Sequence, residues 1–151
     1  MSDSISSPFQ MRDWQIQSFQ YDNPIVSKPN PEAIPSWRFH FHKEFDYRPD
    51  SKAYVGIISI GFSVSVPALP PIDDKLFSMS GTVVSLSTLS EEEGDDASAK
   101  MDRLLSINAT SYTLGALRTF LLQQSALLMR EELIVPSINL NKLEFEKDYS
   151  L

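Results

Sequence analysis

The clearest alternation of hydrophobic and polar positions lies between residues 36 and 47. Every second side chain there is aromatic, and Lys43 is the single interruption of the pattern. A period of two is typical of a β-strand with one buried and one solvated face. The aromatic row consists of Trp37, Phe39, Phe41, Phe45 and Tyr47, and the opposite row of Arg38, His40, His42, Glu44 and Asp46.

Three further segments, 14–21, 54–66 and 76–89, show enough alternation to predict strands. In the first of them the apolar side chains change face at Ser18, which predicts a β-bulge. In 54–66 the residues between the apolar ones are small, so we expect a helix or another subunit to lie close over that face. Short turns between the last three strands predict an antiparallel meander, and a proline-rich connection precedes it.

The period changes in the C-terminal half, where residues 108–131 predict a helix of roughly 24 residues. Leu114, Leu117 and Leu121 follow helical spacing, and a second apolar stripe lies beside them. A stripe this wide exceeds what one small sheet covers, so we expect self-association. The chain therefore predicts an α+β fold, a four-stranded antiparallel sheet with one long helix in its C-terminal half.

Composition narrows the classes of function. The 151 residues fit one domain, and 13 basic against 20 acidic residues give a net charge of −7. This charge argues against nucleic acid and anionic lipid as partners. The absence of cysteine excludes disulfides and thiolate metal sites. No signal peptide or membrane span is evident, so we expect a cytoplasmic protein without membrane insertion.

Candidate chemistry is sparse. His40, His42, Glu44 and Asp46 share one strand face and offer metal ligands, but Arg38 on the same row repels a cation and a solvated face is the simpler interpretation. The acidic residues of 91–96 lack the spacing of a calcium loop, and like charges this dense predict a solvated loop over 90–102. No phosphate-binding or nucleophile motif is present, so we expect no cofactor, no metal and no enzymatic activity.

Several short segments, in this order and at these separations, resemble the bacterial export chaperone SecB. They are Trp14-Gln15-Ile16-Gln17, Pro29-Asn30-Pro31, Trp37, the helical Leu114, Leu117 and Arg118, Val135-Pro136-Ser137-Ile138-Asn139-Leu140, and then Leu143 and Phe145. The resemblance covers residues 13–146, preceded by a flexible arm (1–12) and followed by a short tail (147–151). It implies a dimer of dimers with the helices between the sheets. It also implies ATP-independent holding of non-native polypeptides in apolar grooves, for export or for protection of an antitoxin.

The resemblance also implies roles for particular side chains. The residues expected in the client-binding groove are Trp37, Phe120, Leu127, Ile134, Leu143 and Phe145. Those expected at the oligomer interface are Trp14, Ile16, Leu114, Leu117 and Leu121. The family's second helix has only 146–151 left to form it, so we expect it to be truncated or missing. The acidic positions that dock the SecA motor correspond here to uncharged Asn23, Ser27 and Ser80, which weakens the case for a SecA-type partner.

Two other classes of function fit the same pattern. A curved sheet closed by one helix also suits a carrier of a small apolar ligand, with the aromatic row of 36–47 lining the cavity. A structural or adaptor subunit would use the same shape without binding many clients.

Overall fold

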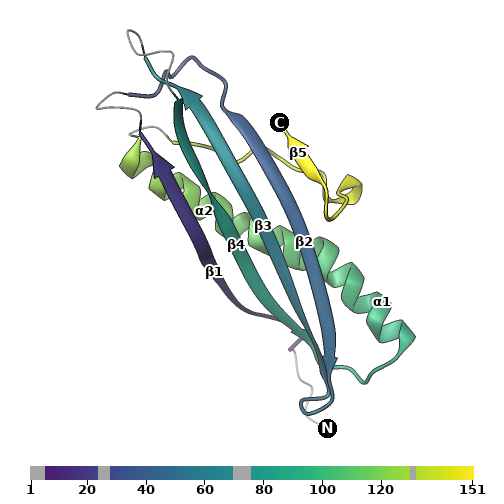
Figure 1. Cartoon of the computed structure of the whole chain (residues 1–151). Coiled ribbons are helices and arrows are strands. Elements are labelled where there is room, and N and C mark those ends of the chain that lie inside the picture. Colours follow the sequence, from purple (N-terminus) through teal and green to yellow (C-terminus); the bar gives the residue numbers. More distant parts are fainter. Residues whose placement is uncertain (1–5, 24–27, 70–75, 130–131) are drawn as a thin grey trace.

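The computed structural model describes residues 6–23, 28–69, 76–129 and 132–151. An antiparallel sheet with the strand order β1-β4-β3-β2-β5 carries one long helix across one of its faces (Figure 1). This confirms the predicted α+β class, with one strand more than expected. The strands are β1 (Phe9–Asp22), β2 (Ser36–Arg48), β3 (Ala53–Pro67), β4 (Leu76–Leu89) and β5 (Asp148–Ser150).

Strands β2, β3 and β4 form the predicted meander, and β1 joins it along the outer side of β4. The β1–β4 register shifts between Ile16 and Ser18, which confirms the predicted bulge, and shifts again between Met11 and Asp13. β1 begins at Phe9, so the prediction of a flexible arm over residues 1–12 is wrong for its last four residues. Backbone pairing of Phe9 with the far end of β4 is the physical reason, because it extends the ladder beyond the alternating segment.

The apolar faces of β2, β3 and β4 lie under the helix and form the core. A Cβ on Gly56 of β3 would lie only 2.6 Å from Met101 Cε, which shows how closely the helix approaches the sheet. The small-residue face of β3 points the other way and is half-buried, with no described element lying over it. The expected cover by a helix of the same chain is therefore wrong, and cover by another subunit stays a prediction. The largest fully buried side chains of the sheet are Phe39, Phe41, Ile58, Ile60, Phe77, Met79 and Leu89.

The helix runs as α1 (Asp95–Leu104), η1 (Leu105–Ala109) and α2 (Thr110–Leu128) without a break. It begins at Asp95 rather than near residue 108, so the predicted solvated loop ends at residue 94. Asp95 and Asp96 occupy the first turn, where negative charge is favourable beside the free N–H groups. Ala97 and Met101 are buried against the sheet and anchor this turn. The density of charge obscured the apolar spacing of these two residues.

The segment η1 is one turn of π-helix, which contains one residue more than an α-helical turn. The Thr110 hydroxyl donates to the Leu105 carbonyl at 2.8 Å and so satisfies an acceptor inside this wider turn. The extra residue keeps Leu114, Leu117 and Leu121 on the same side as Leu105, and all of these side chains are buried on the sheet.

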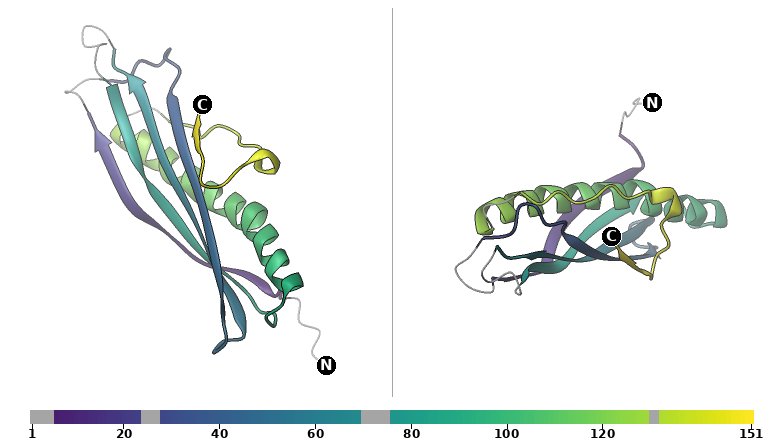
Figure 2. Two further views of the ribbon diagram at one scale, coloured as in Figure 1. Left: turned by 45° about the vertical axis from the view of Figure 1, so that its right-hand side comes forward. Right: turned by 90° about the horizontal axis from the view of Figure 1, so that it is seen from above.

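After the helix, the chain returns along α2 toward the β2 side of the sheet (Figure 2). The Leu133 amide donates to Ser125 Oγ at 2.8 Å, and Arg118 Nη2 donates to the Pro136 carbonyl at 3.5 Å. A short 3-10 turn, η2 (Leu140–Lys142), then leads into β5, which pairs with β2. The residues expected to form a short tail therefore form the fifth strand and no second helix.

Candidate functional site

The first three rings of the aromatic row of β2 contact one another in sequence at the side of the sheet that the C-terminal segment covers, whereas Phe45 and Tyr47 pack on Tyr54. The rings of Trp37 and Phe39 are parallel with centroids 5.6 Å apart, and Phe41 follows at 6.1 Å from Phe39. Phe145 and Tyr149 both meet Phe41 edge to face, at 6.5 and 6.3 Å. The C-terminal segment thus adds two rings to a stack that begins on β2.

Beside this stack lies a cavity of about 190 Å³, which we call the C-terminal pocket. Its lining is mainly apolar, and the C-terminal segment supplies most of it. The lining residues are Phe39, Phe41, Ser137, Ile138, Asn139, Lys142, Leu143, Tyr149 and Leu151.

The backbone of the C-terminal segment closes the edge of β2. The Trp37 amide donates to the Leu151 carbonyl at 3.1 Å, and the Leu151 amide donates to the Trp37 carbonyl at 2.9 Å. The Glu146 amide donates to the Phe41 carbonyl at 2.8 Å. The registered ladder between β5 and β2 nevertheless covers only three residue pairs, from His40↔Asp148 to Arg38↔Ser150.

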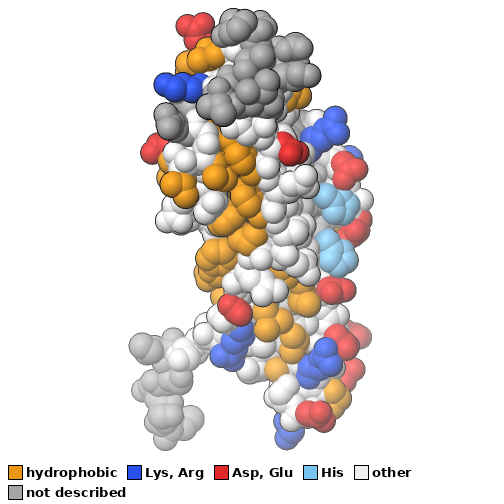
Figure 3. Space-filling view, turned by 60° about the vertical axis from the view of Figure 1, so that its left-hand side comes forward, with side chains coloured by type: hydrophobic (Ala, Val, Ile, Leu, Met, Phe, Trp, Pro, Cys, Tyr) orange, Lys and Arg blue, Asp and Glu red, His pale blue; other side chains and the backbone are white. Residues whose placement is uncertain are grey.

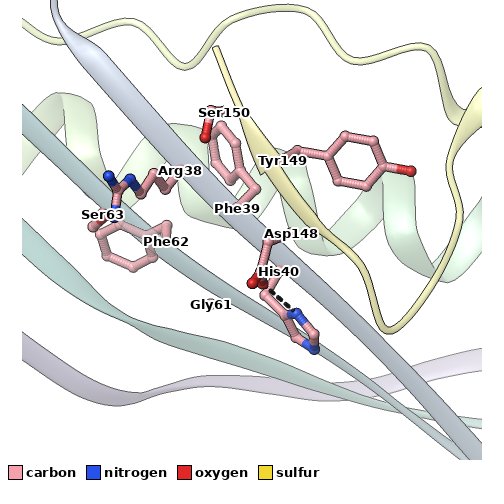
Figure 4. Close-up of a pocket in the computed structure, with 9 residues that line it drawn as sticks. All are labelled: Arg38, Phe39, His40, Gly61, Phe62, Ser63, Asp148, Tyr149 and Ser150. Carbon is pink, nitrogen blue, oxygen red and sulfur yellow. Dashed lines mark hydrogen bonds and ion pairs between the residues drawn. The ribbon is translucent and has the colours of Figure 1, made fainter.

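Imidazole and carboxylate groups pair across this edge on the outer face. His40 Nδ1 lies 2.8 Å from Asp148 Oδ1 (Figure 4), and His40 Nε2 lies 3.4 Å from Glu146 Oε2. His42 Nδ1 contacts Glu146 Oε1, and His42 Nε2 lies 3.6 Å from Glu44. The hydrogen bond to Glu146 is the main reason why the pKa of His42 is raised, and the same bond lowers the pKa of Glu146.

The His40–Asp148 pair lines a shallow hollow of about 450 Å³ on the outer face, drawn in Figure 4. Arg38, Ser63 and Ser150 line it beside His40 and Asp148. Within the described residues, no group of three or more His, Asp or Glu side chains is placed to hold a metal ion.

Lys43 links three elements that the alternation alone does not connect. Its ammonium lies 4.5 Å from the Phe145 ring centroid, 3.0 Å from Asp102 Oδ1 and 2.8 Å from Ser106 Oγ. It therefore holds β2, the helix and the C-terminal segment together. In the alternation Lys43 is only an interruption, although a cation inside an aromatic row is itself an indication of an aromatic or acidic partner.

A second apolar surface follows the outward side of the helix and the chain after it. The side chains of Leu127 and Ile134 are 75% and 77% exposed, so neither contributes to the core. The other large exposed apolar side chains of this surface are Ile107, Tyr112, Leu122 and Leu128. We call these six residues the helix surface.

A third apolar area lies on the outer side of β1, β3 and β4. It is a hollow of about 230 Å³ with Trp14, Ile57, Val84 and Leu86 among its lining residues. Figure 3 shows hydrophobic side chains gathered in a band along this side of the molecule, and the histidines and several carboxylates at the right-hand edge, with other side chains and backbone between them and the band. Trp14 itself is 39% exposed.

The predicted groove residues do not form one groove. Leu143 lines the C-terminal pocket and Phe145 packs on Phe41, both on the β2 side. Phe120 packs edge to face on Phe19 of β1, at the opposite side of the sheet, with centroids 5.1 Å apart. Leu127 and Ile134 belong to the helix surface. Trp37 is only 5% exposed, because Phe39 and the Leu151 backbone cover it, so it offers a client almost no surface, contrary to its predicted place in the groove.

The predicted interface residues also lie in two different environments. Leu114, Leu117 and Leu121 are buried between helix and sheet of the same chain, which corrects their assignment to contacts between subunits. Helical spacing alone identified their buried face but not its partner. Trp14 and Ile16 lie on the outermost strand, where Ile16 is half-buried, and their role at an interface stays a prediction. Of the positions linked to SecA, Ser27 lies outside the described residues.

Among the described residues, no helix combines the length and the apolarity that a membrane crossing requires.

Comparison with known proteins places the fold. No family model matches the sequence, and no curated protein matches it either. Among solved structures, the SecB-like chaperone Rv1957 of Mycobacterium tuberculosis, in complex with a ChAD peptide from the antitoxin HigA1, is similar with a TM-score of 0.59 and 13% identity. The match covers 87% of this chain and 91% of that chain. A protein of unknown function from Streptococcus agalactiae matches with a TM-score of 0.52 and 10% identity, over 86% of this chain and 97% of that chain. The SecB-like fold suggested by the sequence is thereby confirmed.

Proposed function

We propose that this chain is an ATP-independent chaperone that holds segments of unfolded polypeptide on exposed apolar surface. The observation that carries the proposal is the helix surface, where five large apolar side chains are exposed on a helix whose other side is already buried, and Ile134 adds a sixth from the chain after the helix. Exposed apolar side chains concentrated on one helix and the chain after it indicate an interaction site.

The physical basis is the hydrophobic effect, which depends on area and hardly on direction. An unfolded chain presents apolar side chains in many arrangements, and an exposed apolar surface binds them without requiring a particular sequence. Such binding needs no catalytic group and no cofactor, in keeping with the absence of catalytic motifs from the sequence.

The structural comparison supports a polypeptide as the ligand, because the SecB-like neighbour was solved with a peptide from an antitoxin. We propose preproteins and labile antitoxins as the two client classes, and the cytoplasm as the place where both are met. Self-association belongs to the same proposal, since Trp14 and Ile16 on the outermost strand offer a second copy an apolar edge. A SecA-type motor is not part of it, because Asn23 and Ser80 are uncharged.

A carrier of small apolar ligands is less well supported. Pockets for such ligands usually measure about 300–1,000 Å³. The C-terminal pocket measures only about 190 Å³, with Leu143 and Tyr149 among the residues that line it.

The test is suppression of aggregation of a chemically unfolded substrate, with the oligomeric mass measured in parallel. The variant is the double substitution Leu127→Ser and Ile134→Ser, because both side chains are three-quarters exposed and contribute little to the core. We expect suppression to fall several-fold while the thermal midpoint stays unchanged.

Gln123→Ser is the matched control, since Gln123 is an exposed polar residue of the same helix. Full suppression by the double variant at unchanged mass would remove the helix surface from the proposal. A parent chain that suppresses no aggregation at all would refute the chaperone function.

A further inference from the structure

We infer that the edge of β2 is a binding site for an extended polypeptide segment with alternating apolar and acidic residues, and that β5 occupies this site in the free protein. The inference rests on the proposed function and adds a second place of client binding, apart from the helix surface, together with the form in which the client binds there.

The backbone of β2 offers much more than β5 uses. β2 has 13 residues, whereas β5 pairs with three of them. On that side of β2, the described chain provides no further strand. A longer client strand would gain hydrogen bonds along the unused part of the edge, as in other strand-addition complexes.

The side chains of β5 indicate what the site selects. Tyr149 and Leu151 line the C-terminal pocket beside Phe39, so alternate positions take apolar groups. Asp148 points to the outer face and meets His40 at 2.8 Å. Ser150, directly opposite Arg38, is the position where a second carboxylate would find a cation.

Several features make β5 replaceable. The Asp148 side chain is 92% exposed, so little of it is buried by docking. Glu146, which precedes the strand, has φ of 61°, a left-handed conformation that costs free energy for any residue except glycine. A client strand enters without this strained turn.

A reversible disulfide tests whether the site must open. The chain has no cysteine, so Arg38→Cys with Ser150→Cys introduces one defined pair. Trp37 and Leu151 exchange both hydrogen bonds, which makes the adjacent Arg38–Ser150 pair the non-hydrogen-bonded kind. Cα atoms of such pairs lie about 4.5 Å apart, within the range that a disulfide spans.

The probe is a fluorescent synthetic peptide with the sequence of residues 143–151, measured by polarisation. We expect at least about tenfold weaker binding to the oxidised double variant than to the reduced one, because affinity scales with the open fraction. Tyr149→Ala in the protein should strengthen peptide binding, and Ser150→Asp in the peptide should strengthen binding to the parent chain. Ser150→Cys alone, treated with the same oxidant, is the matched control.

Equal peptide binding by the oxidised and reduced double variant would overturn the inference, as would no binding to either the reduced protein or Tyr149→Ala. Failure of the disulfide to form would contradict the docked position of β5.

Aggregation assays separate the two proposals. Suppression that is equal in both redox states leaves the chaperone function standing and removes this site, whereas a parent chain without suppression refutes the function whatever the peptide does.

Discussion

Substitution of Gly81 by alanine tests how tightly the bulge of β1 fits against β4. A Cβ at this position would lie 2.2 Å from the Ser18 carbonyl oxygen, so the strands must separate by about 0.8 Å to reach even a 3.0 Å contact. The obstructing atom is backbone, which cannot rotate away as a side chain does. Overpacking costs about 1–3 kcal/mol, and the lower entropy of unfolded alanine returns about 0.4–1 kcal/mol. Because the clash is with backbone, we take the upper end of the overpacking range and expect the free energy of unfolding to fall by about 2 kcal/mol in total.

Urea unfolding followed by circular dichroism measures this loss. With a slope of about 2 kcal/mol per molar urea, the midpoint should fall by about 1 M. Gly61→Ala is the matched control on the neighbouring strand, because its new methyl group would find its nearest neighbour at 3.8 Å. An unchanged midpoint for Gly81→Ala, or an equal fall in both variants, would refute the fit deduced from the bulge.

Three further predictions concern the helix and the C-terminal segment. Leu117→Ala should lower the free energy of unfolding by about 3 kcal/mol without changing the mass in light scattering, because the side chain is buried within one chain; a changed mass at full stability would restore its role between subunits. Lys43→Met should cost about 1 kcal/mol in urea unfolding, since it removes a cation beside the Phe145 ring and a part-buried ion pair. The raised pKa of His42 means that its contribution to docking is present below pH 6.5 and is lost as the pH rises through the raised value. The lowered pKa of Glu146 means that its contribution is present above pH 4.5 and is lost as the pH falls through the lowered value. Hydrogen-exchange protection of the Glu146 amide should therefore be greater at pH 5.5 than at pH 8.5, and His42→Gln should reduce that difference; stronger protection at pH 8.5 would contradict the pairing.

The sheet could be predicted because one face of each long strand is buried by the same chain. Trp37, Phe39 and Phe41 alternate with polar residues for that reason, and the face change at Ser18 marks a real bulge. Where local charge dominates, the pattern fails. The first turn of α1, at Asp95, is helical although it is acidic. Its carboxylates interact favourably with the free N–H groups of the turn, and the buried Met101 fixes the helix on the sheet.

The candidate site was harder to predict than the fold. Spacing shows that Leu117 and Leu127 share a helix, but not that one is buried on the sheet and the other is exposed. The docking of Phe145 and Tyr149 on Phe41 joins positions more than 100 apart in the sequence, and no local pattern encodes a pairing of that range. The exposure of Ile134 likewise depends on the path that the chain takes after the helix.

The π-helical turn η1 has a consequence for how this chain can change over time. Each residue of an α-helix advances it by about 100°, so loss of one residue from 105–109 would rotate all of α2 by that angle relative to α1. Leu117 would then turn away from the sheet, and Arg118 would take its place, as Gly115 would for Leu114 and Leu122 for Leu121. A one-residue change in the length of this turn therefore changes which side chains of α2 are exposed along its whole length, whereas a substitution on α2 changes one exposed side chain at a time.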